Sequence, residues 1–117
     1  MKFDFFKGKK KLSVNVLKMN FLTQYLGLMF SSSKTSIRLF SYSKDCGIMI
    51  HSWFVFYPFL IVWLDKSKKV IGFKKVLPFT SCVIPKKKFR HFIEIPFNSL
   101  NKKILSNFVS GININKI

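Results

Sequence analysis

Short segments in which apolar and polar residues alternate recur along the chain. Between residues 11 and 17, the apolar residues Leu12, Val14 and Val16 alternate with polar ones, which is the pattern of a strand with one buried face. The segment 89–95, closed by Pro96, also has the composition of a strand. Further strands are predicted at 37–42, 70–73 and 112–117.

Two short helices are expected from their capping residues. Asn20 is a suitable N-cap, and Gly27 suits the left-handed position just past a helix end. The second helix begins at Asn98 or Ser99 and ends at Gly111. Its apolar residues have helical spacing and are Leu100, Ile104, Leu105 and Phe108.

The central run 46–64 contains no Asp, Glu, Lys or Arg and is long enough for a transmembrane helix. Three features oppose a membrane-embedded chain: His51 and Pro58 interrupt the run, its residues are mostly aromatic or β-branched, and Lys and Arg flank both ends. The alternative is a pair of buried strands, 48–57 and 60–64, with Pro58 at the bend. We favour the strands and expect no transmembrane span.

Turn signals separate the remaining segments. Asp65 begins a turn that runs to Lys68, and Asp is typical of that position. Pro78 and Pro85 bracket a loop or a short edge strand.

Composition then sets the fold class. Hydrophobic residues make up 49% of the 117 residues, which excludes a disordered basic tail and suits one domain over 1–117. The chain has 15 Phe, and its wealth of Phe, Ile and Val favours strands. We predict an all-β fold, a sandwich or squashed barrel with two short helices.

The cysteines and the first residues bear on the compartment. Cys46 and Cys82 are too few for a disulfide framework, and whether they pair is left open. The opening MKFDFFKGKKK lacks the apolar core of a signal peptide, so we expect a cytoplasmic chain.

Several motifs, in this order, resemble one family. They are Gly27-Leu28-Met29-Phe30, the segment 50–58 (IHSWFVFYP), Leu64-Asp65-Lys66, Leu77-Pro78-Phe79 and Ile93-Glu94-Ile95-Pro96. Together, over about residues 11–115, they are similar to the domain-of-unknown-function 192 family of small archaeal and bacterial proteins.

The resemblance implies a jelly-roll-like, all-β fold and no established activity. This chain departs from the family pattern at three positions. Leu60 and Ile112 stand where the family usually has Asp, and Lys68 stands where it has the turn Gly. The first two replacements weaken any polar site carried over from the family.

Signatures of catalysis are missing, so the sequence argues against an enzyme. There is no P-loop, dinucleotide-binding or nucleophile-elbow motif. The four acids, at positions 4, 45, 65 and 94, form no adjacent pair, and the His and Cys spacing predicts no metal site. No catalytic residue and no cofactor is expected.

Two residues are candidates for a small-molecule pocket or an enzyme site. His51, in an apolar segment, is either a proton carrier or ligand contact, or a satisfied core histidine. Glu94 lies between Ile93 and Ile95 and is either an acid at a cavity mouth or an outward-facing partner of Arg90 or a lysine. The structural interpretation is favoured for both.

The basic residues provide the leading functional hypothesis. With 21 basic and 4 acidic side chains, the chain has a formal net charge of +17. Lys86, Lys87, Lys88 and Arg90 form the densest cluster, beside Pro85, and are predicted to bind anions. The alternative interpretation of this cluster is that it is a solvated run of charges that reflects a bias towards lysine in the sequence. The sequence indicates a non-enzymatic binding protein with an anionic ligand, and the candidate ligands are a nucleic acid or another polyanion.

Overall fold

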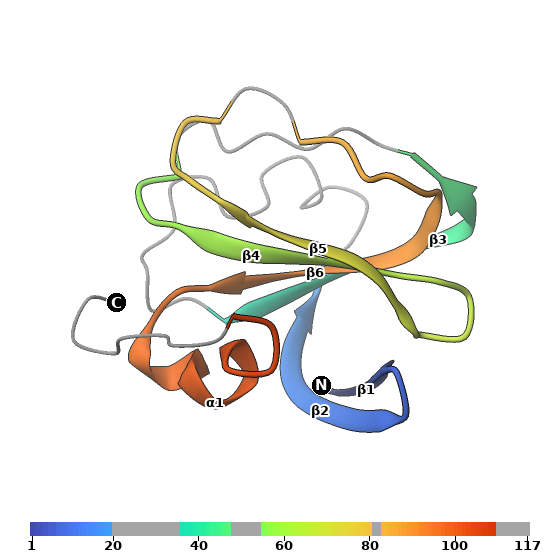
Figure 1. The fold of residues 1–117 in the computed structure, drawn as a ribbon, viewed down its shortest axis with the longest axis horizontal. Coiled ribbons are helices and arrows are strands. Elements are labelled where there is room, and N and C mark those ends of the chain that lie inside the picture. The colour runs from blue at the N-terminus through green and yellow to red at the C-terminus, as the bar shows by residue number, and fades with distance from the viewer. Residues whose placement is uncertain (20–35, 48–54, 81–82, 110–117) are drawn as a thin grey trace.

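The computed structural model describes residues 1–19, 36–47, 55–80 and 83–109 (Figure 1). It is built mainly from strands, as the sequence predicts. The strands are β1 (Lys2–Lys7), β2 (Lys10–Lys18), β3 (Ile37–Cys46), β4 (Phe59–Leu64), β5 (Val70–Val76) and β6 (Phe89–Pro96). A 3-10 turn, η2 (Ser99–Asn101), leads into a short helix, α1 (Lys102–Leu105).

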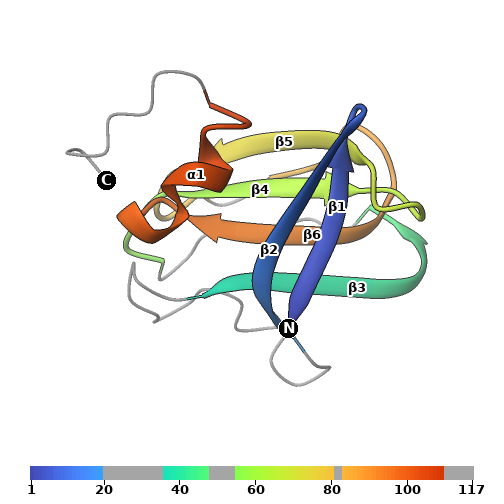
Figure 2. The ribbon, with the colours of Figure 1, turned by 90° about the horizontal axis from the view of Figure 1, so that it is seen from below.

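The six strands form one curled, mixed sheet in the order β1-β2-β3-β6-β4-β5. Neighbouring strands are antiparallel except β2 and β3, which are parallel. The curl brings β1 close to the residues that directly precede β5. There the Phe6 amide donates to the Lys68 carbonyl at 2.8 Å, beside a bridge between Phe6 and Lys69. The sheet is therefore a half-barrel (Figure 2).

The concave face of the half-barrel holds one hydrophobic core. Phe3 and Phe5 of β1 pack there with Leu105 of α1 and Phe108, and the Phe5 and Phe108 rings stack at 6.3 Å between centroids. The short helix thereby closes one end of the curled sheet.

The opposite face carries a second buried cluster, and β4 is shared by both. Leu60, Val62 and Leu64 face the first core, whereas Ile61 and Trp63 face the second. Every residue of β4 is buried. Two covered faces explain the uninterrupted apolar sequence of this strand.

The turn between β4 and β5 forms as predicted around Asp65. Its Oδ1 accepts hydrogen bonds from the amides of Ser67 at 2.8 Å and Lys69 at 3.0 Å. Lys68 has φ +65°, in the left-handed region where the resembled family has glycine.

The predicted cap forms at Asn98, where it begins η2. Asn98 is extended, and its side-chain oxygen accepts from the Asn101 amide at 2.9 Å. Of the two predicted alternatives, Asn98 and Ser99, the cap is Asn98. The prediction that the helix runs to Gly111 is wrong, because α1 ends at Leu105.

Two predictions of strand position need correction. β1 was not expected, although Phe3 and Phe5 alternate with Lys2 and Asp4. The described part of the predicted strand 48–57, residues 55–57, is not in a strand. The predictions of a helix between Asn20 and Gly27 and of a strand at 112–117 lie outside the described residues.

The central run is not one continuous helix, since its last six residues form β4. In the parts of the chain that the structure describes, no helix has the length and apolar character needed to cross a membrane.

Candidate anion-binding site

Of the two residues predicted to share a pocket, His51 and Glu94, the structure describes only Glu94. His51 lies outside the described residues, so its role stays a prediction. Glu94 is only 6% exposed and lies on β6 between Arg38 of β3 and Ile61 of β4. The interpretation of Glu94 as an outward-facing partner of Arg90 is therefore wrong, because β6 is an interior strand of the sheet.

Burial dominates the electrostatics of Glu94. It raises the pKa of the carboxyl to about 8, and the positive charge of Arg38 acts in the opposite direction. Burial also raises the pKa of Tyr42 to about 12, with smaller contributions from Cys46 and Glu94. Glu94 is thus a buried acid of the sheet rather than an exposed anion.

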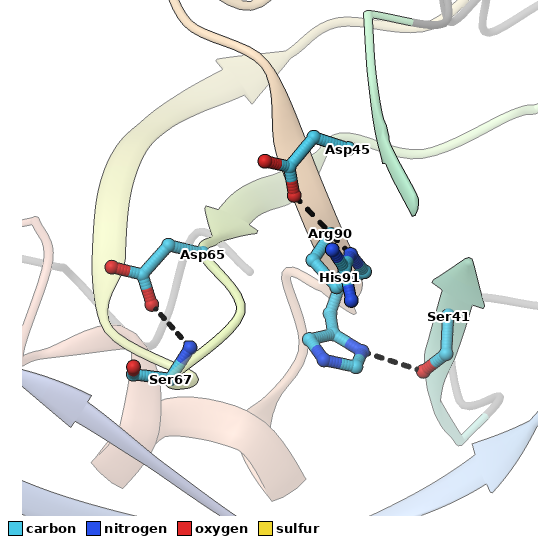
Figure 3. Close-up of polar contacts among 6 residues, drawn as sticks. All are labelled: Ser41, Asp45, Asp65, Ser67, Arg90 and His91. Carbon is cyan, nitrogen blue, oxygen red and sulfur yellow. Dashed lines mark hydrogen bonds and ion pairs between the residues drawn. The ribbon is translucent and has the colours of Figure 1, made fainter. Parts of the chain in front are cut away.

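The predicted basic cluster divides into two parts. Lys86, Lys87 and Lys88 are exposed. Arg90 instead donates from Nε to Asp45 Oδ1 at 3.2 Å, and its side chain is mostly buried (Figure 3). Three of the four cations therefore face solvent, and the fourth is held by a carboxylate of β3.

His91, the next residue of β6, lies on the other side of the strand from Arg90 (Figure 3). Its Nδ1 is 2.8 Å from Ser41 Oγ. Burial lowers the pKa of this imidazole, and so do the charges of Lys68, Arg90 and Lys18. His91 belongs to the packing of the sheet and not to the basic surface.

A cavity of about 420 Å³ lies where the basic segment meets the edge of the sheet. We call it the β5 pocket. It is bounded by residues 71–74 of β5, by Trp63 of β4 and by the segment 84–87. Its size is within the range of small-molecule sites.

Three lysines and one aromatic side chain line the β5 pocket. Lys74 comes from the edge strand, and Lys86 and Lys87 come from the following loop. Trp63 provides aromatic surface, whereas the Phe73 ring points to the other face of β5, towards Phe108. Cations gathered around an apolar wall suit a ligand that has both a negative charge and a flat hydrophobic part.

The register of β4 and β5 forms this pocket. Gly72 pairs with Trp63 across the two strands. A Cβ atom at residue 72 would lie 3.5 Å from Trp63 Cε3, so the cavity reaches the indole because residue 72 lacks a side chain. Lys74 is two residues further along and faces the same side.

The sequence analysis did not predict a pocket formed by Trp63, Gly72 and Lys74. Trp63 is 4% exposed. The available signal was the period of two, which places Gly72 and Lys74 on one face of β5. Their proximity to Lys86 depends on the path of the loop.

A second cavity, of about 570 Å³, lies between β2 and the C-terminal helical segment. Two of its three lysines already have protein partners. Lys10 Nζ donates to Asn107 Oδ1 at 2.6 Å, and Lys11 Nζ lies 3.5 Å from Asp4 Oδ2. This cavity is therefore a weaker candidate for anions than the β5 pocket.

None of the four carboxylates of the chain lines the β5 pocket. Asp4 contacts Ser13 and Lys11, Asp45 contacts Arg90, and Asp65 accepts from the turn amides, while Glu94 is buried. The positive potential of the pocket is thus not neutralised within its own wall.

Metal binding has no support in the described ranges, where no three His, Cys, Asp or Glu residues cluster suitably for an ion. Cys82 lies outside those ranges, so its pairing with Cys46 stays open.

Comparison with known proteins shows similarity at the level of the fold. No family model matches the chain, and no curated protein matches it. A crystal structure described as a putative transcription regulator from Sinorhizobium meliloti is similar with a TM-score of 0.71 and 10% identity, over 86% of this chain and 82% of that one.

A protein of unknown function from Novosphingobium aromaticivorans is similar with a TM-score of 0.69 and 12% identity, over 86% of this chain and 74% of that one. At these identities the likeness establishes that the chain shares the fold of these two bacterial proteins.

Proposed function

We propose that this chain is a non-enzymatic binding protein for polyanions, and that the β5 pocket and the adjoining lysines contact the phosphates of a nucleic acid. The observation that carries the proposal is the convergence of Lys74, Lys86 and Lys87 on one cavity whose wall contains no carboxylate. Lysine ammonium groups are compact charges that bind phosphate without requiring one orientation.

The convergence involves two separate segments of the chain. Lys86 and Lys87 are neighbours in sequence, so a run of lysines explains their proximity to each other. Lys74 belongs to a different element, and its presence at the same cavity results from the fold. This supports a shared anion site over three independent solvated side chains.

Nucleic acid is the polyanion to test first, because it presents phosphates at a regular, dense spacing. The structural neighbour from Sinorhizobium meliloti carries the description of a putative transcription regulator. That description belongs to the neighbour, and here it serves only to decide which candidate ligand is tested first.

The test is a salt titration of binding to random duplex and to single-stranded RNA. Each neutralised duplex phosphate contributes about −0.9 to the slope of log affinity against log salt, so loss of three contacts should remove roughly −2.7. The variant changes Lys74, Lys86 and Lys87 to Gln.

The matched control changes the exposed Lys9, Lys102 and Lys103 to Gln, which removes the same charge outside the β5 pocket. We expect the first variant to lose more of the slope than the control. Equal slopes in the two variants, or no binding by the wild type at about 50 mM salt, would overturn the proposal.

We also propose that the chain is a divergent member of the domain-of-unknown-function 192 family, with the jelly-roll-like fold that the resemblance implies. In support, Asp65 begins the β4–β5 turn, and Pro96 ends β6 ahead of the last helix. An experimental structure should then show a short helix directly before Gly27. A strand at that position would contradict the assignment.

A further inference from the structure

We propose that the β5 pocket holds one nucleotide unit, with its base against the apolar wall and its phosphate among Lys74, Lys86 and Lys87. The inference rests on the proposed function and narrows the ligand to a nucleotide whose base is not paired, either in a single strand or free in solution. Two features of the pocket beyond its charge support it.

The first feature is exposed apolar surface inside a concave site. Ile84 is 64% exposed and lines the pocket together with Pro85 and Trp63. The Phe73 ring is not part of this surface, because it points to the other face of β5 and contacts Phe108 there, with 5.1 Å between centroids. A flat base can cover the apolar surface that Ile84 and Pro85 present.

The second feature is a buried donor without an acceptor. Trp63 is 4% exposed, and no group among the described residues accepts a hydrogen bond from its Nε1. A buried, unsatisfied N–H destabilises a protein unless a partner is supplied. Bases present ring nitrogens and carbonyl oxygens as acceptors, whereas a hydrocarbon ligand presents none.

Duplex nucleic acid fits this pocket less well. Its bases are stacked and paired, and extruding one costs free energy that a single strand does not pay. A duplex can still reach the lysines through its phosphates. The pocket should therefore discriminate single strands from duplex, while the lysines bind both.

The test separates the pocket from the charge. Gly72→Val places a side chain in the cavity and leaves the net charge unchanged. Binding of labelled oligothymidine and of a duplex is compared for wild type, Gly72→Val and a control, Asn15→Val, which adds a similar side chain at an exposed position of β2. We expect Gly72→Val to weaken single-strand binding by about tenfold, which corresponds to a loss of about 1.4 kcal/mol of contact with the base.

The duplex affinity and its salt slope should remain at the wild-type value in Gly72→Val, and Asn15→Val should behave as wild type with both ligands. Ile84→Ser is the second variant. It removes apolar surface from the wall of the pocket at an exposed loop position, so it should not destabilise the sheet. It should also weaken single-strand binding selectively. Unchanged single-strand affinity in both pocket variants would overturn the inference.

A competition experiment identifies the source of the nucleotide. Thymidine monophosphate should displace the labelled strand at lower concentration than inorganic phosphate does, since the base adds contacts. Equal potency of the two competitors would overturn the inference. An oligomer that competes better than the monophosphate indicates a strand as ligand, and the reverse indicates a free nucleotide.

The two proposals fail in different ways. If the wild type binds neither single strand nor duplex at low salt, the polyanion-binding function itself is wrong. If it binds both through the lysines and the pocket variants bind normally, only the nucleotide assignment is wrong.

Discussion

Glu94 of β6 lies directly opposite Arg38 of β3, on the face of the sheet that carries the second hydrophobic cluster. Its other neighbour in the sheet is Ile61 of β4. Arg38 also donates from Nη1 to Met19 Sδ at 3.6 Å. The chain therefore places an acid and a base side by side in a largely apolar layer, where the acid holds its proton more tightly than in water.

Stability should depend on pH through Glu94. Burial raises its pKa from an ordinary value of 4.5 to about 8, so between these pH values the folded state keeps a proton that the unfolded state releases. Stability is then highest below about 4.5 and falls as pH rises to about 8, by an amount on the order of a few kcal/mol. Glu94→Gln should flatten this dependence.

Urea unfolding at a series of pH values checks this expectation. His91 acts in the opposite direction, because its pKa is lowered and its contribution to stability is lost as pH falls. Because wild type and Glu94→Gln both contain His91, the difference between their stability curves reports the contribution of Glu94 alone. Parallel stability curves for the two proteins would show that the carboxyl titrates normally in the folded state.

Val55 and Phe56 are neighbours with opposite environments. Val55 is 2% exposed and belongs to the second cluster, whereas Phe56 is 63% exposed. Val55→Asp buries a carboxylate and should cost several kcal/mol, enough to unfold a marginally stable domain. Phe56→Asp should change stability by less than about 1 kcal/mol. Urea unfolding measures both, and equal effects would contradict the assigned burial.

The β4–β5 turn depends on one carboxylate oxygen. Asp65→Ala removes the acceptor for the Ser67 and Lys69 amides and should lower the free energy of unfolding by about 1–2 kcal/mol. Asp65→Asn keeps an oxygen at the same position and should recover most of that loss. If Asn destabilises as much as Ala, charge and not hydrogen-bond geometry stabilises the turn.

Asp45 should weaken anion binding at the neighbouring basic segment. Asp45 is exposed and pairs with Arg90. Arg90 follows Lys86, Lys87 and Lys88 in the sequence. Asp45→Asn removes a negative charge and releases the guanidinium, so affinity for single-stranded RNA should rise several-fold at low salt. Stability should change by less than about 1 kcal/mol. The rise should disappear at high salt, and a salt-independent effect would point to a change in structure.

Local patterns in the sequence determine the individual elements. Alternation at Leu12, Val14 and Val16 fixes which face of β2 is buried, because side chains along a strand point to opposite sides in turn. Asp65 and Asn98 fix a turn and a helix start through hydrogen bonds to amides a few residues away. The sequence analysis did not predict β1, because its two alternating Phe residues lie in a segment rich in lysine.

The order of the strands was decided only by the tertiary structure. β6 lies between β3 and β4, and this position buries Glu94, which its own segment presents as one acid between two apolar residues. The β5 pocket likewise requires Lys74 to meet Lys86 and Lys87 across the path of a loop. Which strands pair depends on contacts between distant segments, and a period of two along one segment carries no information about its partner.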